Sequence, residues 1–102
     1  MATDIVTPAD VEAAARHLAP IVRETALETS PRLSGLVEQP VHLKREDLQV
    51  GRSYKVRGAY NFISSLAPEE RAHGIVCASA GNHAQGVAYA CHQLRIPGKV
   101  FL

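Results

Sequence analysis

The sequence predicts an α/β domain in which parallel strands are flanked by helices. Two short apolar runs with β-branched residues, at 74–78 and 99–102, have the composition of strands. A segment with helical spacing, 84–94, separates them, and further helical segments precede them. Strands that alternate with helices in this way are typical of a parallel sheet covered by helices. The length of 102 residues fits one domain.

The first helix is predicted over residues 8–18. Thr7 can cap its first turn, and Pro8 suits the first helical position, where the missing N–H would be unpaired in any case. Pro20 marks the end of this helix. Apolar residues recur at helical spacing between these limits, at Val11, Ala14, Ala15 and Leu18.

Residues 19–40 are expected to be mainly loop and short turns, because proline, serine and glycine interrupt any regular period there. A short strand is predicted at 41–44, where apolar and polar residues alternate. The charged segment 44–49 is expected to lead into a loop. A helix is predicted from about residue 56, with apolar residues on one side at Val56, Ala59, Tyr60, Ile63 and Leu66.

The second half of the chain continues the alternation. A short helix over 68–71 begins at a proline, and the apolar run 74–78 is predicted to be a buried strand. A tight loop at 79–82 leads into the helix 84–94, and residues 99–102 are predicted to begin another strand. The inward residues of the helix 84–94 are expected to be Val87, Ala88, Cys91 and Leu94.

Charge and composition argue against several kinds of partner. Eleven lysines and arginines balance ten aspartates and glutamates, so the net charge is +1 and no basic patch for nucleic acid or an anionic membrane stands out. No apolar run approaches the roughly 20 residues of a membrane-spanning helix. The first residues lack the pattern of a secretory signal. We therefore expect a cytoplasmic protein that binds neither nucleic acid nor membrane.

Lys55 is the first candidate for chemistry, because it lies at the boundary of a loop and a helix, between Tyr54 and Val56. Aromatic and apolar neighbours can desolvate a lysine, and burial lowers the pKa of an ammonium group. An amine that loses its proton readily is a nucleophile for aldehydes, with which it forms a Schiff base. The alternative is a lysine in solvent at the surface, the usual place for this residue type.

The segment 79–86 is the second candidate, because it joins a predicted strand to a predicted helix. The N–H groups at a helix start are unpaired and carry partial positive charge, which suits a carboxylate or a phosphate. Gly81 lets the backbone approach a ligand, and Ser79 and Asn82 add short polar groups. In an open α/β sheet, ligands bind outside the carboxyl ends of the strands, where this loop would lie. The alternative is a plain helix cap by Ser79 or Asn82.

The five histidines show no metal-ligand spacing, so the sequence predicts no metal site. His83 is the functional candidate among them, because it lies at the ligand-facing helix start. The other four are interpreted as structural or exposed: His17, His42, His73 and His92.

Three stretches, at 43–49, 53–61 and 78–86, together resemble one family. They read Leu-Lys-Arg-Glu-Asp-Leu-Gln, Ser-Tyr-Lys-Val-Arg-Gly-Ala-Tyr-Asn and Ala-Ser-Ala-Gly-Asn-His-Ala-Gln-Gly. Their order and gaps are similar to those of the threonine dehydratase (threonine ammonia-lyase) branch of the fold-type II pyridoxal-phosphate enzymes. The resemblance covers nearly the whole chain, and three linked motifs are far more specific than either loop alone.

The resemblance implies a role for each matching residue. Lys55 matches the lysine that holds pyridoxal 5′-phosphate as a Schiff base and later moves protons at the α-carbon of the substrate. Asn82 matches the residue whose side chain hydrogen-bonds the 3′ oxygen of the cofactor, and Tyr54 matches an aromatic position that packs near the cofactor. The loop that binds the substrate carboxylate is matched by Ser79, Gly81, Asn82 and His83.

The implied reaction converts L-threonine to 2-oxobutanoate and ammonia, in isoleucine biosynthesis or in threonine catabolism. L-Serine is a second candidate substrate, and related enzymes such as serine racemase and serine dehydratase are alternatives because they share similar motifs. The full-length enzymes of this family are expected to be homo-oligomers.

The family is much longer than this chain, so residues 1–102 are expected to be an N-terminal fragment of the catalytic domain, with the motifs in 41–102. The loop that grips the cofactor phosphate, the partner of the pyridine nitrogen and any regulatory domain would lie beyond residue 102. Such a fragment is expected to be inactive by itself, and a non-catalytic truncated remnant is the alternative reading.

Overall fold

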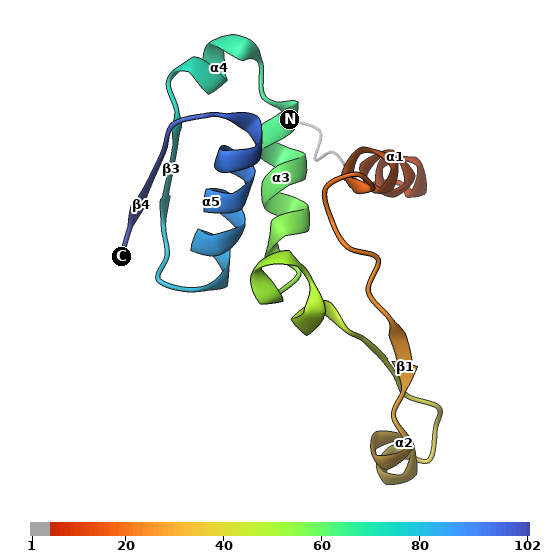
Figure 1. Ribbon diagram of the computed structural model, residues 1–102. Coiled ribbons are helices and arrows are strands. Elements are labelled where there is room, and N and C mark those ends of the chain that lie inside the picture. The colour runs from red at the N-terminus through yellow and green to blue at the C-terminus, as the bar shows by residue number, and fades with distance from the viewer. Residues whose placement is uncertain (1–4) are drawn as a thin grey trace.

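The computed structural model describes residues 5–102 (Figure 1). The start of the chain, where no secretory pattern is found, lies partly outside these residues. The elements, in chain order, are α1 (Pro8–Leu18), β1 (Leu27–Thr29), α2 (Pro31–Val37), β2 (His42–Lys44), the 3-10 turns η1 (Glu46–Leu48) and η2 (Val50–Arg52), α3 (Lys55–Ser65), α4 (Pro68–Ala72), β3 (Ile75–Ala78), α5 (Asn82–Leu94) and β4 (Gly98–Phe101).

The strands β3 and β4 form a parallel pair that α5 connects, as the sequence predicts. Their register runs from Ile75 opposite Gly98 to Ala78 opposite Phe101. The helices α3 and α5 lie side by side on one face of this pair, and both run in the direction opposite to the strands (Figure 1). The carboxyl ends of β3 and β4 and the N-termini of α3 and α5 therefore lie at the same end of the molecule.

The core lies between α3 and α5, with the end of α1 against it. The predicted inward face of α3 is confirmed at Val56, Ala59, Tyr60 and Ile63, which are all buried. In α5 the buried residues are Gly86, Val87, Ala90 and Cys91, whereas Ala88, expected to point inward, is exposed. Residues 87, 90, 91 and 94 share one helix face at spacings of three and four, and position 88 lies off that face.

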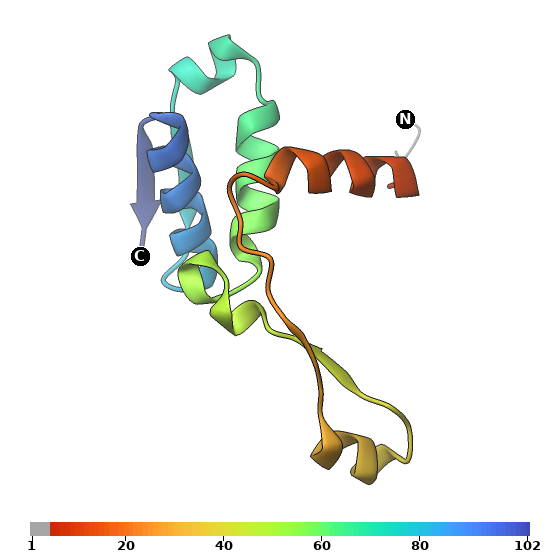
Figure 2. The same ribbon diagram turned by 45° about the vertical axis from the view of Figure 1, so that its right-hand side comes forward.

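Residues 19–40, expected to be mainly loop, contain β1 and α2. Pro31 occupies the first turn of α2, and the Ser30 hydroxyl accepts the N–H of Leu33 at 3.3 Å, so this proline starts a helix instead of interrupting one. The strand β1 pairs with β2 from Leu27 opposite Lys44, and the pair is antiparallel. Parallel pairing is thus confirmed only for β3 and β4. Figure 2 shows this hairpin extending away from the helices, with α2 at its tip.

The strand β3, predicted to be buried, is covered on one side only. Ile75 and Cys77 pack against the core, whereas Val76 between them is 67% exposed. This alternation follows from the pleat of a strand, because the helices α3 and α5 cover a single face of the pair. Within residues 5–102, none of the helices has both the length and the apolarity to cross a membrane.

Candidate functional site

Lys55 is the first residue of α3, which is the helix boundary where the sequence places it. The chain reaches it through two successive residues with left-handed backbone, Gly51 (φ 75°) and Arg52 (φ 60°). The Ser53 hydroxyl then accepts the N–H of Lys55 at 3.3 Å. The Lys55 Nζ lies 5.4 Å from the centroid of the Tyr54 ring, so the aromatic face and the amine are adjacent. Lys55 is half-buried, and Tyr54 is largely exposed.

The backbone of Lys55 lies directly against the second turn of α5. A Cβ added at Gly86 would lie 3.0 Å from the Lys55 carbonyl carbon, 3.1 Å from its oxygen and 3.2 Å from the Val56 nitrogen. These distances are shorter than ordinary van der Waals contacts, and the neighbouring atoms are backbone. Only glycine lets the two helices approach this closely. Gly86 therefore sets the position of the first turn of α3 relative to α5.

The loop after β3 contains the other predicted site residues. The Ser79 hydroxyl accepts the N–H groups of Gly81 and Ala84, both at 3.2 Å, so it pairs one N–H of the first turn of α5 from outside the helix, whose N-cap residue is Gly81. Asn82 and His83 are the first two residues of this helix, and their side chains are exposed. The N–H groups of a first helical turn have no acceptor within the helix, so the capped helix start still offers donors to an anion.

The structure brings these residues to one end of the molecule. Lys55 starts α3, Asn82 starts α5, and the Ser79 loop follows the carboxyl end of β3 at that same end (Figure 1). Beside the loop lies a hollow of about 260 Å³ whose lining is mostly apolar. Its lining residues come from α3, β3 and α5 and are Gly58, Ala59, Phe62, Ile63, Ile75, Val76, His83 and Val87.

A polar network around Glu46 was not foreseen from the sequence, where 44–49 is only a charged segment before a loop. Both carboxylate oxygens of Glu46 accept hydrogen bonds from the Arg57 guanidinium, one of them at 3.1 Å. The Thr25 hydroxyl donates to the same carboxylate at 2.6 Å, and the Lys44 Nζ donates to the Thr25 carbonyl at 2.5 Å. The opposite charges of Glu46 and Arg57, eleven residues apart, are the only trace of this network in the sequence.

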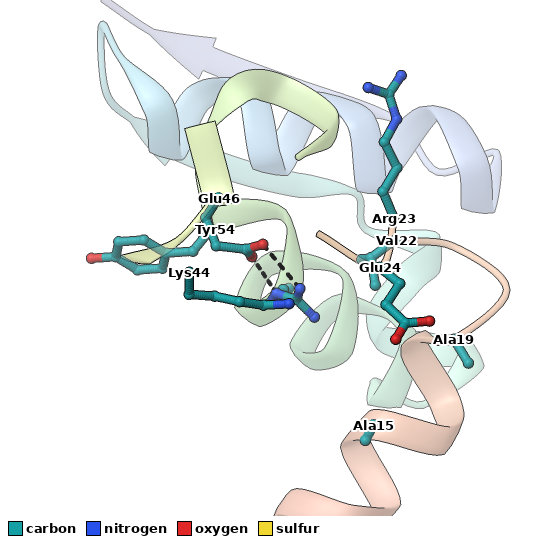
Figure 3. Close-up of a pocket in the computed structure, with 9 residues that line it drawn as sticks. Ala15, Ala19, Val22, Arg23, Glu24, Lys44, Glu46 and Tyr54 are labelled. Carbon is teal, nitrogen blue, oxygen red and sulfur yellow. Dashed lines mark hydrogen bonds and ion pairs between the residues drawn. The ribbon is translucent and has the colours of Figure 1, made fainter. Parts of the chain in front are cut away.

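Figure 3 shows the hollow into which this ion pair faces. It has a volume of about 610 Å³ and lies between the end of α1 and the start of α3. Tyr54 contributes to its wall, but Lys55 and the Ser79 loop do not. The candidate site and this hollow are therefore separate places that share the turn before α3.

Glu46 should make the stability of the protein depend on acid pH. Hydrogen bonds from Arg57 lower the pKa of its carboxyl from 4.5 to about 2, against the opposing effect of burial, and Thr25 adds to the lowering. Because the folded-state pKa is depressed, the stabilisation is complete above pH 4.5 and is lost as the pH falls toward 2. We expect the difference in unfolding free energy between the protein and Glu46→Gln to shrink across this range in urea titrations. A difference that stays constant with pH would contradict this origin.

A family model and a curated relative each match most of the chain. Residues 18–102 match the model of the family described as pyridoxal-phosphate dependent enzyme. The chain is 54% identical to the biosynthetic L-threonine dehydratase of Mycobacterium leprae over 100 residues, which are 98% of this chain and 23% of that protein. The chain thus spans less than a quarter of the length of the curated relatives it matches.

Two solved structures are also similar. A threonine deaminase from T.th. has a TM-score of 0.78 and 41% identity, with coverage of 92% of this chain and 32% of that chain. The serine racemase of Dictyostelium discoideum has a TM-score of 0.86 and 34% identity, with coverage of 93% and 31%. The resemblance to threonine dehydratases and the predicted fold class are thereby confirmed. This chain belongs to the family of pyridoxal-phosphate dependent enzymes, and its fold is that of the N-terminal part of the fold-type II members.

Proposed function

We propose that the protein is a threonine dehydratase that converts L-threonine to 2-oxobutanoate and ammonia, with pyridoxal 5′-phosphate bound covalently at Lys55. The observation that carries the proposal is the placement of Lys55, at the first residue of α3, on the same end as the N-terminus of α5. The names of the curated relatives favour threonine as the substrate and isoleucine biosynthesis as the pathway. The same reading implies a cytoplasmic homo-oligomer in which residues 41–102 contribute the lysine and the carboxylate loop.

The residues present fit this cofactor and substrate. Pyridoxal phosphate has an aldehyde, for which a half-buried lysine amine is the matching nucleophile. The substrate has a carboxylate, for which the N–H groups of Asn82 and His83 are suitable donors because these residues begin a helix. The exposed amide of Asn82 can donate to the ring oxygen of the cofactor, and the Tyr54 ring, adjacent to the Lys55 amine, can cover the cofactor on one side.

The side chains of the site would have different roles in the reaction. When bound, the cofactor supplies an electron-withdrawing ring that stabilises negative charge at the α-carbon of the substrate. The Lys55 amine, at the first residue of α3, would hold the cofactor and would serve as the base for the α-proton of the substrate. The loop from Ser79 to His83 holds the carboxylate and so orients the α-carbon. The water lost in the β-elimination returns in the hydrolysis that releases ammonia, so the overall reaction is balanced.

Serine racemase activity is the second candidate, because the Dictyostelium discoideum racemase has the TM-score of 0.86. Both activities begin with removal of the α-proton, so Lys55 and the Ser79 loop would serve either one. The reaction products distinguish the two activities. Formation of 2-oxobutanoate from L-threonine indicates the dehydratase, and formation of D-serine from L-serine indicates the racemase.

The chain has three lysines, so covalent attachment can be tested at each of them. The protein is mixed with pyridoxal phosphate, reduced with borohydride and digested, and the labelled peptides are identified by mass spectrometry. We expect the label to concentrate on Lys55, since the Lys44 amine already donates to the Thr25 carbonyl and Lys99 is exposed on β4. Lys99→Arg should leave the label in place, and Lys55→Ala should remove it. An even distribution over the three lysines would contradict the proposal.

A further inference from the structure

Gln49 joins the turn before α3 to a distant part of the chain. Its side chain is fully buried, with 0% of the residue exposed. Its Oε1 accepts the N–H of Arg23 at 2.8 Å, and its Nε2 donates to the carbonyl of the same residue at 2.8 Å. The Oε1 also accepts the N–H of Val50 at 2.9 Å. A single amide thus pairs with both backbone groups of Arg23, as a neighbouring strand would, and ties the 22–25 segment to η1 and η2.

Glu46 extends this connection past Lys55. Its carboxylate accepts from the Thr25 hydroxyl on one side and from the Arg57 guanidinium on the other, and the Gln49 amide lies 3.4 Å from its Oε2. The ion pair between Glu46 and Arg57, marked by dashed lines in Figure 3, joins residues on either side of Lys55. The chain between them therefore forms a closed loop. Within the described residues, every buried side-chain nitrogen or oxygen has a hydrogen-bond partner.

We propose that Glu46 is a positioning residue for Lys55, which it holds in place through its ion pair with Arg57. Arg57 lies in the first turn of α3, two residues after the lysine, and Glu46 is itself fixed by Thr25 and by the turn that Gln49 anchors. The network therefore sets the direction in which α3 begins and with it the direction of the Lys55 amine. The inference rests on the proposed role of Lys55 in binding the cofactor.

The network and Gly86 act on different sides of the same helix start. Gly86 sets how closely the backbone of Lys55 approaches α5, and the buried face of α3 holds the rest of the helix against α5. The ion pair adds a second point of attachment, at Arg57, to a different part of the chain. A paired guanidinium and carboxylate have a fixed mutual geometry, which a single hydrogen bond lacks. Two attachments at separate points fix the orientation of the first turn of α3. We therefore expect loss of the Glu46 carboxylate to make Lys55 more mobile while the core stays packed.

The matched pair of variants is Glu46→Gln and Glu24→Gln. Both make the same chemical change, and both residues line the 610 Å³ hollow, but Glu24 is exposed and takes no part in the network. The readout is the ratio of pyridoxyl label on Lys55 to label on Lys99 in the full chain after reduction. Because misplacement of a reacting group by about 1 Å can cost up to ~10²-fold in rate, we expect this ratio to fall about tenfold in Glu46→Gln. It should not change in Glu24→Gln. An unchanged ratio in Glu46→Gln, with the circular dichroism spectrum retained, would overturn the proposal.

Hydrogen exchange tests the same inference without the cofactor. We expect amides in residues 55–58 to exchange faster in Glu46→Gln than in Glu24→Gln, while residues 87–94 of α5 keep their protection. Equal exchange at 55–58 in the two variants would contradict the positioning role.

If the unmodified protein shows no preference for labelling at Lys55, the proposed function fails, and the exchange result alone decides the role of Glu46. If Glu46→Gln does not fold, Arg57→Lys is judged by the same criteria, because lysine keeps the positive charge but cannot make the paired hydrogen bonds of the guanidinium to the carboxylate.

Discussion

Replacing Gly86 by alanine is expected to destabilise the protein and to abolish most of the covalent capture at Lys55. The added methyl group would lie 3.0 Å from the Lys55 carbonyl carbon, and no side chain can rotate away to make room because the contact is with backbone. The start of α3 must therefore shift from α5, which disturbs the buried contacts of Val56 as well. Overpacking of this kind costs about 1–3 kcal/mol. Urea denaturation gives the change in stability, and the borohydride label on Lys55 gives the change in capture.

Gly58→Ala is the matched control, because the same substitution falls in α3 at a place where no atom lies within 4 Å. Gly58 is exposed and helical, so alanine should increase the unfolding free energy by about 0.5–1 kcal/mol. Capture at Lys55 should be unchanged. If Gly86→Ala were as stable as Gly58→Ala and captured the cofactor equally well, the close approach of the two helices would have no importance for the site.

Replacing Gln49 by leucine is expected to cost about 3 kcal/mol or more, because each buried polar group left without a partner costs roughly 1–3 kcal/mol. The substitution keeps most of the volume but leaves the N–H and carbonyl of Arg23 and the N–H of Val50 without their partner. The site is fully buried, so water has little access to replace the amide. The change in unfolding free energy from urea denaturation measures this effect.

Gln93→Leu provides the comparison, since Gln93 is an exposed residue of α5. Exposed substitutions away from specific contacts usually change stability by no more than about 0.5 kcal/mol. A cost for Gln49→Leu as small as that for Gln93→Leu would show that the buried amide does not hold the two segments together.

Local signals allowed much of the fold to be predicted. The apolar spacing from Val56 to Ile63 predicts the buried face of α3, and the capping pattern at Thr7 and Pro8 predicts the start of α1. These signals suffice because helix periodicity and caps depend on residues a few positions apart. The parallel pairing of β3 and β4 was also foreseen, because a helix separates two apolar runs.

The parts that were missed depend on contacts between residues far apart in the sequence. The strand β1 has three residues, all exposed, so no apolar alternation marks it, and its pairing with β2 involves residues up to 17 positions away. Gln49 binds Arg23 across 26 positions, through backbone groups that carry no sequence signal. The candidate residues at 55 and 79–83 were identified from motifs. Their placement at the same end of the molecule follows from the directions of the strands and helices. The closeness of Gly86 to Lys55 could not be predicted from spacing at all.

The closed loop between Glu46 and Arg57 makes the length of this segment matter more than its composition. Within α3, a residue added or removed between Lys55 and Arg57 would rotate the lysine by about 100° around the helix axis relative to the ion pair. A rotation of that size would turn the amine away from the α5 start. Exposed side chains of the turn can be exchanged without touching the ion pair, although Gly51 and Arg52 need residues that tolerate a left-handed backbone. An added or removed residue must instead be accommodated inside a loop whose two ends the ion pair holds together. Evolution of this turn should therefore proceed by exchange of side chains at constant length.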